Sequence, residues 1–253
     1  MELQEDFNEK KAEVEEYIQL LEDINSTMQE GTIFLTARHE YNGSKLCSIS
    51  PQQQKIMFSC LYLQLYNLVE STVLGCISQL EQTIKQISMD NWLRLNIYLR
   101  KELIHSWVRK NGNGAEDTRG KAILELVDSM FIENGVIQFV FDKRRNGGNW
   151  DDKGIEEFAR NIGMSLEIHH DLYQSTKKKL FNGQGGLSLI RAFRNELAHG
   201  GVSFVQCGER LDFSQLKSLA YIVFEYLQAV IQRFQIFINN QEYFLAVTPS
   251  AER

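Results

Sequence analysis

Proline is nearly absent from this chain, with 2 in 253 residues, and cysteine is sparse, with 4. The remaining composition, 43% hydrophobic and 24% charged with 17 glycines, is that of an ordinary globular protein and excludes global disorder, a collagen-like chain or low complexity. The cysteines are widely spaced and form no CxxC pair, which argues against a disulfide framework and a cysteine-based zinc site. We therefore expect a reduced protein whose thiols act as small hydrophobes, at Cys47, Cys60, Cys76 and Cys207.

The sequence also lacks an uninterrupted run of 18 apolar residues and a positive net charge, and we expect no leader. Its first residues, MELQEDFNEKKAEVEE, are acidic where a signal peptide would be basic and then apolar. We expect a cytoplasmic protein with no membrane span. The net charge of −6 argues against a protein that coats nucleic acid through its overall field, because such binding needs many Lys and Arg on phosphates. A small, local basic site remains open.

What the sequence does contain is helical periodicity. Apolar residues recur at sevens through residues 2–30, which predicts one long amphipathic helix that packs on its own domain or serves as a dimer arm. Ser50-Pro51 is a helix start, and about 37 residues without another proline follow it. Further helices are expected, with a few irregular or short β inserts, over about 90–109, 119–133, 151–162, 168–180, 187–199 and 212–238. The fold class is all-α, a single bundle over 1–253 with long antiparallel helices.

Residues 185–201, GGLSLIRAFRNELAHGG, form the most informative helix. One face carries only apolar side chains, and the opposite face carries Arg191, Arg194, Asn195 and His199 around the small Ala198. The histidine lies in the last turn, where the helix dipole favours a positive charge, and Asn195, one turn earlier, could orient its ring.

These residue types suit RNA cleavage. Guanidinium groups can hold a phosphate bidentately, and histidine is the side chain best suited to moving a proton near neutral pH. The 2′-hydroxyl of RNA can attack its own phosphate, whereas DNA has no such group. This set requires no metal, and we expect no cofactor.

An Arg-x4-His spacing by itself is weak evidence, because the chain contains a second copy at Arg100 and His105. That copy lies in the middle of a predicted helix, without following glycines and without Asn after the Arg. We interpret it as a coincidence.

Together, RNELAHGG, the segment YLQLYNLVESTV at 62–73 and the closing helix from 212 to about 244 resemble the HEPN superfamily, in its bacterial MAE-like and RiboL-PSP-like branches. Ribonuclease members of that superfamily carry Arg-x4-6-His, often with Asn, Asp or His directly after the Arg. The resemblance covers about half of the chain. Residues 111–183 match nothing in it and are interpreted as a branch-specific insert.

The resemblance implies a HEPN bundle that forms a homodimer, in which two motifs meet in one cleft and make a metal-independent endoribonuclease site. Arg194 would contact the phosphate, His199 would act as acid or base, and Asn195 would assist. Similar proteins are commonly toxins of toxin–antitoxin or phage-defence systems, held in check by a partner protein. The acidic net charge favours a restricted RNA such as tRNA. The alternative is a non-catalytic module that binds a nucleotide or a protein through the same helix face.

Other charged residues were weighed as contributors to substrate binding. Glu70 directly follows an apolar stretch and either points to solvent or pairs with a basic site residue. Lys177 and Lys178 are either solvated charges or contacts to the RNA backbone. His169-His170-Asp171 resembles a metal cluster, but adjacent helical side chains diverge and no partner motif follows, so no metal site is expected.

Overall fold

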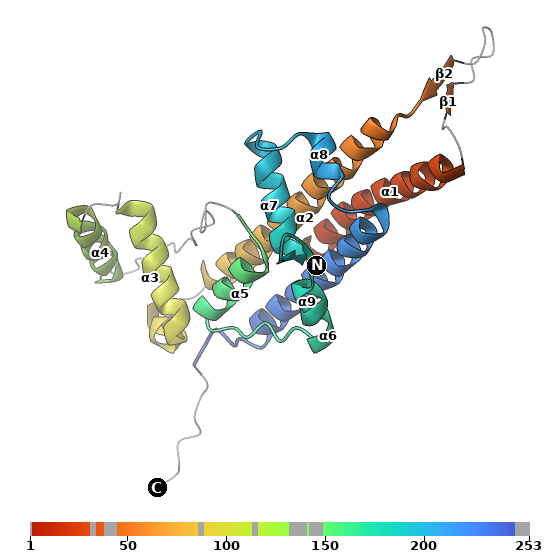
Figure 1. The fold of residues 1–253 in the computed structure, drawn as a ribbon. Coiled ribbons are helices and arrows are strands. Elements are labelled where there is room, and N and C mark those ends of the chain that lie inside the picture. Colours follow the sequence, from red (N-terminus) through yellow and green to blue (C-terminus); the bar gives the residue numbers. More distant parts are fainter. Residues whose placement is uncertain are drawn as a thin grey trace. The chain divides into compact units, whose positions relative to one another are not determined.

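The fold is described from a computed structural model, which describes residues 2–30, 34–37, 45–85, 89–112, 116–131, 141 and 149–245. It divides into two compact units, Met1–Val69 with His169–Leu227 and Glu70–Ile168 with Gln228–Arg253. Two long helices, α2 (Pro51–Lys85) and α9 (Phe213–Asn239), run from one unit into the other (Figure 1). The units are described one at a time, and the single domain predicted over 1–253 stays a prediction.

The first unit is built around α1 (Glu2–Glu30) and the first halves of α2 and α9. Most apolar heptad positions of α1 are buried as predicted, while Tyr17 and Met28 are half-buried, and the Tyr17 hydroxyl donates to the Met57 carbonyl on α2 at 3.0 Å. Lys217 on α9 is ion-paired with Glu22 on α1 at 2.6 Å. The helix predicted over 2–30 is therefore confirmed, and in this unit it packs on its own chain, at Leu3, Phe7, Val14, Ile18, Leu21 and Ile24.

The predicted start of α2 is confirmed by a reciprocal cap. The Gln53 backbone N–H donates to the Ser50 hydroxyl, and the Ser50 N–H donates to the Gln53 side chain at 2.7 Å. By length and apolar composition α2 could cross a membrane, but 56% of its most apolar window is buried inside the protein. Burial of that kind is typical of a core helix.

The remaining helices and strands of the first unit are short. They are β1 (Phe34–Ala37) paired antiparallel with β2 (Lys45–Ser48), α6 (His170–Lys177), β3 (Lys179–Phe181) paired with β4 (Gln184–Gly185), α7 (Gly186–Ala198) and α8 (Phe204–Gly208). The helix predicted over 168–180 is therefore too long. It ends at Lys177 because the chain turns into the β3–β4 hairpin, whose close approach to the end of α6 requires glycine at 185 and 186.

The second unit contains η1 (Met89–Arg94), α3 (Ile97–Asn111), α4 (Glu116–Phe131), α5 (Asp152–Asn161) and the ends of α2 and α9. The single helix predicted over 90–109 is wrong, because a 3₁₀ turn and a new helix replace it. Asn96 caps α3 by accepting the Leu99 N–H at 2.8 Å and donates to the Ile162 carbonyl at 3.1 Å. A side chain held in this way favours a break in the helix.

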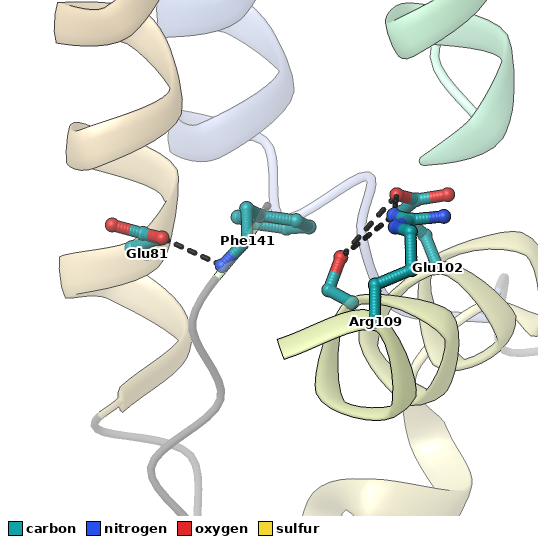
Figure 2. Close-up of polar contacts among 5 residues, drawn as sticks. Glu81, Glu102, Arg109 and Phe141 are labelled. Carbon is teal, nitrogen blue, oxygen red and sulfur yellow. Dashed lines mark hydrogen bonds and ion pairs between the residues drawn. The ribbon is translucent and has the colours of Figure 1, made fainter. Parts of the chain in front are cut away.

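Several buried polar groups in the second unit are hydrogen-bonded to specific partners. Figure 2 shows the Glu81 carboxylate accepting the Phe141 backbone N–H at 2.6 Å, and Glu102 paired with Arg109 at 2.8 Å. Arg233, also buried, donates to the Ser165 carbonyl and to Glu242. These contacts fix Phe141, Ser165 and Glu242 to the helices around them.

The predicted all-α class is confirmed by these elements, and the β content of the described residues is limited to two small strand pairs and one isolated bridge between Leu95 and Phe244. Two of the short β inserts expected from the sequence, a strand-like run at 136–141 and a turn at Asn42-Gly43, lie outside the described residues, apart from Phe141.

Candidate functional site

The site is built on α7, whose apolar stripe is buried as predicted at Leu189, Ile190, Phe193 and Leu197. Phe193 is the centre of that packing. Its ring meets Tyr62 of α2 edge-on, with ring centres 4.8 Å apart, and Phe181 of β3 at 5.7 Å. Aromatic rings packed in this geometry fix the rotation of α7 about its own axis, so the opposite face points outward.

Arg210, in the loop between α8 and α9, also holds α7 in place. Its guanidinium lies over the Phe193 ring at 4.7 Å and over Phe181 at 5.3 Å, and it is ion-paired with Glu196 at 2.6 Å. The sequence analysis missed this residue. A cation held against two rings and a half-exposed carboxylate keeps the last turns of α7 in place.

α7 ends in a glycine-terminated motif that presents His199 to solvent. The Gly201 N–H donates to the Glu196 carbonyl at 2.8 Å and the Gly200 N–H to the Leu197 carbonyl at 3.3 Å, while Gly200 has a φ of +69°. This is a Schellman end, and it requires the left-handed conformation that glycine adopts without strain. His199 is exposed, and its imidazole has no hydrogen bond or ion pair among the described residues.

Arg194 is half-buried and held in a defined orientation. Its guanidinium lies 4.3 Å from the ring centre of Tyr66 on α2, and its Nη1 donates to the Asn195 Oδ1 at 2.8 Å. The Asn195 backbone carbonyl accepts the His199 N–H at 3.0 Å. Asn195 therefore contacts both predicted catalytic residues, but its side-chain oxygen orients Arg194, whereas we expected it to orient the His199 ring.

Arg191 is half-buried on α7, one turn before Arg194 and Asn195. Glu70 is half-buried on α2 and belongs to the second unit, so its predicted pairing with a basic site residue stays a prediction.

Lys177 and Lys178 lie at the other end of α7. A Cβ on Gly185 would touch their backbone, and the 13 residues of α7 separate that point from His199. At 1.5 Å per residue the separation is about 20 Å. Lys177 lies over the Tyr173 ring at 5.0 Å, and Lys178 lines a pocket of about 250 Å³ with Lys179 and Ser214. The structure therefore does not bring these lysines to the Arg194–His199 face.

Neither thiol nor metal chemistry has a counterpart in the described part of the chain. Cys60, Cys76 and Cys207 are free, and burial raises the pKa of each, to about 12 for Cys76, so these thiols stay protonated. His169 lies 3.9 Å from Asp171, but no group of three metal-ligating side chains occurs among the residues searched.

Comparison with known proteins gives one match. The sequence model of the MAE_28990-like HEPN family matches residues 1–243. No curated protein and no solved structure matches the chain.

The Schellman end predicts a difference between two neighbouring glycines. Gly200→Ala should lower the free energy of unfolding by about 1 kcal/mol, because an alanine at positive φ is strained while its Cβ meets no other atom. Gly201→Ala is the matched control, since a Cβ there makes an ordinary contact at 3.6 Å, and it should be neutral. Urea denaturation of both variants measures this, and equal stability would contradict the assigned motif.

Proposed function

The chain belongs to the MAE-like HEPN family, and on that premise we propose that it is a metal-independent endoribonuclease acting through Arg194 and His199. One observation carries the proposal. The exposed imidazole of His199 lies at the end of α7, and the guanidinium of Arg194, earlier on the same helix, is oriented by the Tyr66 ring and the Asn195 amide. His199 is exposed, and a Cβ built on the neighbouring Gly200 would meet no atom within 4 Å.

The proposed reaction is transesterification within the RNA strand. A general base takes the proton of a 2′-hydroxyl, whose oxygen forms a bond to the adjacent phosphorus. The bond from phosphorus to the 5′ oxygen of the next nucleotide breaks, and a general acid protonates that oxygen. The products are a 2′,3′-cyclic phosphate and a 5′-hydroxyl. Arg194 is suited to the extra negative charge on the phosphoryl oxygens, because its guanidinium is held in place before substrate binds.

The proposal includes a homodimer. The polar face of α7 offers one imidazole, that of His199. The reaction, however, needs one group to take a proton and another to give one. A symmetric pair of chains supplies a second His199 and a second Arg194 to the same cleft. Arg191 is proposed to contact the neighbouring phosphate, with Asn195 holding Arg194. The pairing of Glu70 with a basic site residue stays a prediction from the sequence.

The proposed substrate is a restricted RNA such as tRNA, because the chain carries a net charge of −6 and lacks a strong general attraction to phosphate. Lys177 and Lys178, about 20 Å along α7 from His199, would then contact the RNA backbone well away from the cut. We further propose a cytoplasmic role as a toxin or phage-defence effector, restrained by a partner protein, with no cofactor.

A non-catalytic module that binds a nucleotide or a protein is the second candidate. It is favoured by the absence of any hydrogen-bond partner for the His199 imidazole within the described chain, since a catalytic histidine is usually oriented by a neighbour.

Replacing the imidazole separates the two candidates. His199→Ala should lower the rate of RNA cleavage at least about a hundredfold, because it removes the proton-transferring group. The helical circular dichroism signal should not change, because the side chain is exposed. His170→Ala, which removes an exposed histidine from α6, is the matched control and should cut at the wild-type rate. Full activity of the His199 variant would reject the ribonuclease.

Mixing experiments test whether two chains share one site. If each cleft needs His199 from both chains, an equal mixture of wild type and His199→Ala, allowed to exchange subunits, retains about one quarter of the activity. A site complete within one chain retains about one half at the same total concentration. The second result, or a monomer by sedimentation that still cuts RNA, would exclude the composite cleft.

A further inference from the structure

A second basic site lies in the other unit, on a face of α3 that the proposed reaction does not use. A surface pocket of about 350 Å³ is formed where η1 meets the first turns of α3 (α3 is labelled in Figure 1). Its lining residues follow the helical spacing of one α3 face, with an indole from η1 at the end, and are Trp92, Ile97, Arg100, Lys101, Ile104 and His105. Both members of the Arg-x4-His copy that the sequence analysis set aside therefore line one pocket.

The basic groups of this pocket are not engaged elsewhere. Among the described residues, the side chains of Arg100, Lys101 and His105 make no hydrogen bond or ion pair, and the Arg100 Nε is buried without an acceptor. No lining residue is a carboxylate. The nearest acid in the sequence, Glu102, is buried and bound to Arg109 at 2.8 Å. The pocket therefore carries local positive charge on a protein whose net charge is negative.

The chemistry of the walls selects the ligand. A small inorganic anion would leave the indole and the two isoleucines in contact with water, whereas a flat aromatic group would cover them. Ile97 is 57% exposed, so one side of the pocket is open. The volume of the pocket lies at the lower end of the range for small-ligand sites. A pocket of this size fits one planar group, whereas a bound helix would require a long groove.

We propose that this pocket binds an unpaired nucleotide of single-stranded RNA, with the base stacked on Trp92 and flanking phosphates contacted by Arg100, Lys101 and His105. Stacking on an aromatic side chain with nearby cations is the usual basis for binding single-stranded RNA without strong sequence preference. The inference rests on the proposed function for its ligand and adds a recognition site separate from Arg194 and His199.

The experiment measures binding, not cleavage. A fluorescein-labelled single-stranded RNA decamer is titrated with the full chain carrying His199→Ala, and fluorescence anisotropy is followed at several salt concentrations. Trp92→Leu should weaken binding at least about fivefold, and Trp92→Phe, which keeps an aromatic ring, should retain most of the affinity. Arg100→Gln with Lys101→Gln should reduce the slope of log affinity against log salt by about 1.4, the value for two lost phosphate contacts.

Lys110→Gln is the matched control, because it removes one exposed positive charge from α3 outside the pocket and should change neither quantity. Unchanged RNA affinity in the Trp92 and Arg100/Lys101 variants would overturn the inference, as would their binding an acidic helical peptide while RNA binding stays intact. Since Lys101 is exposed, Lys101→Gln alone, which should lower the salt slope by about 0.7, provides a test that does not depend on repacking around Trp92.

The outcomes separate this site from the proposed nuclease. If His199→Ala cuts RNA normally while Trp92→Leu loses affinity, the reaction proposal fails and the pocket stands. If His199→Ala is inactive and the pocket variants bind like Lys110→Gln, the pocket inference fails and the nuclease stands. A wild-type chain with no affinity for the decamer overturns the pocket inference.

Discussion

The candidate site depends on how Phe193 is packed. Tyr62 and Phe181 contact its ring from α2 and β3, and the Arg210 guanidinium lies over it while pairing with Glu196. This packing fixes the rotation of α7, and the rotation decides which side chains face outward. If Phe193 were not enclosed, the polar face of α7 would have no defined direction.

One face of α2 contacts both the buried Phe193 ring and the Arg194 guanidinium of α7. Tyr62 and Tyr66 are one helical turn apart, and the first packs against Phe193 while the second lies beneath the Arg194 guanidinium. Both tyrosines are almost fully buried, and burial raises the pKa of Tyr62, so that ring acts as a neutral packing surface. The same helix therefore anchors the core and orients the cation proposed to meet the phosphate.

Much of this site was predictable because it follows from local sequence patterns. The apolar stripe of α7, its end at Gly200 and the capped start of α2 follow from helical spacing, glycine conformation and a Ser-Pro pair. Arg210 and Tyr66 were missed, since Arg210 contacts α7 from beyond α8 and Tyr66 looks like an ordinary core residue in an apolar run. The break before α3 depends on the hydrogen bond from Asn96 to the Ile162 carbonyl, and no local sequence pattern predicts that contact.

Family membership and fold agree with the residues on α7, while the reaction itself is proposed from their chemistry. The most direct test is the chemical nature of the ends left when the purified protein is incubated with total RNA in EDTA. The account predicts fragments that end in 2′,3′-cyclic phosphate and begin with a 5′-hydroxyl, at an undiminished rate. Fragments with 3′-hydroxyl ends, or cleavage abolished by EDTA and restored by a divalent metal, would contradict it.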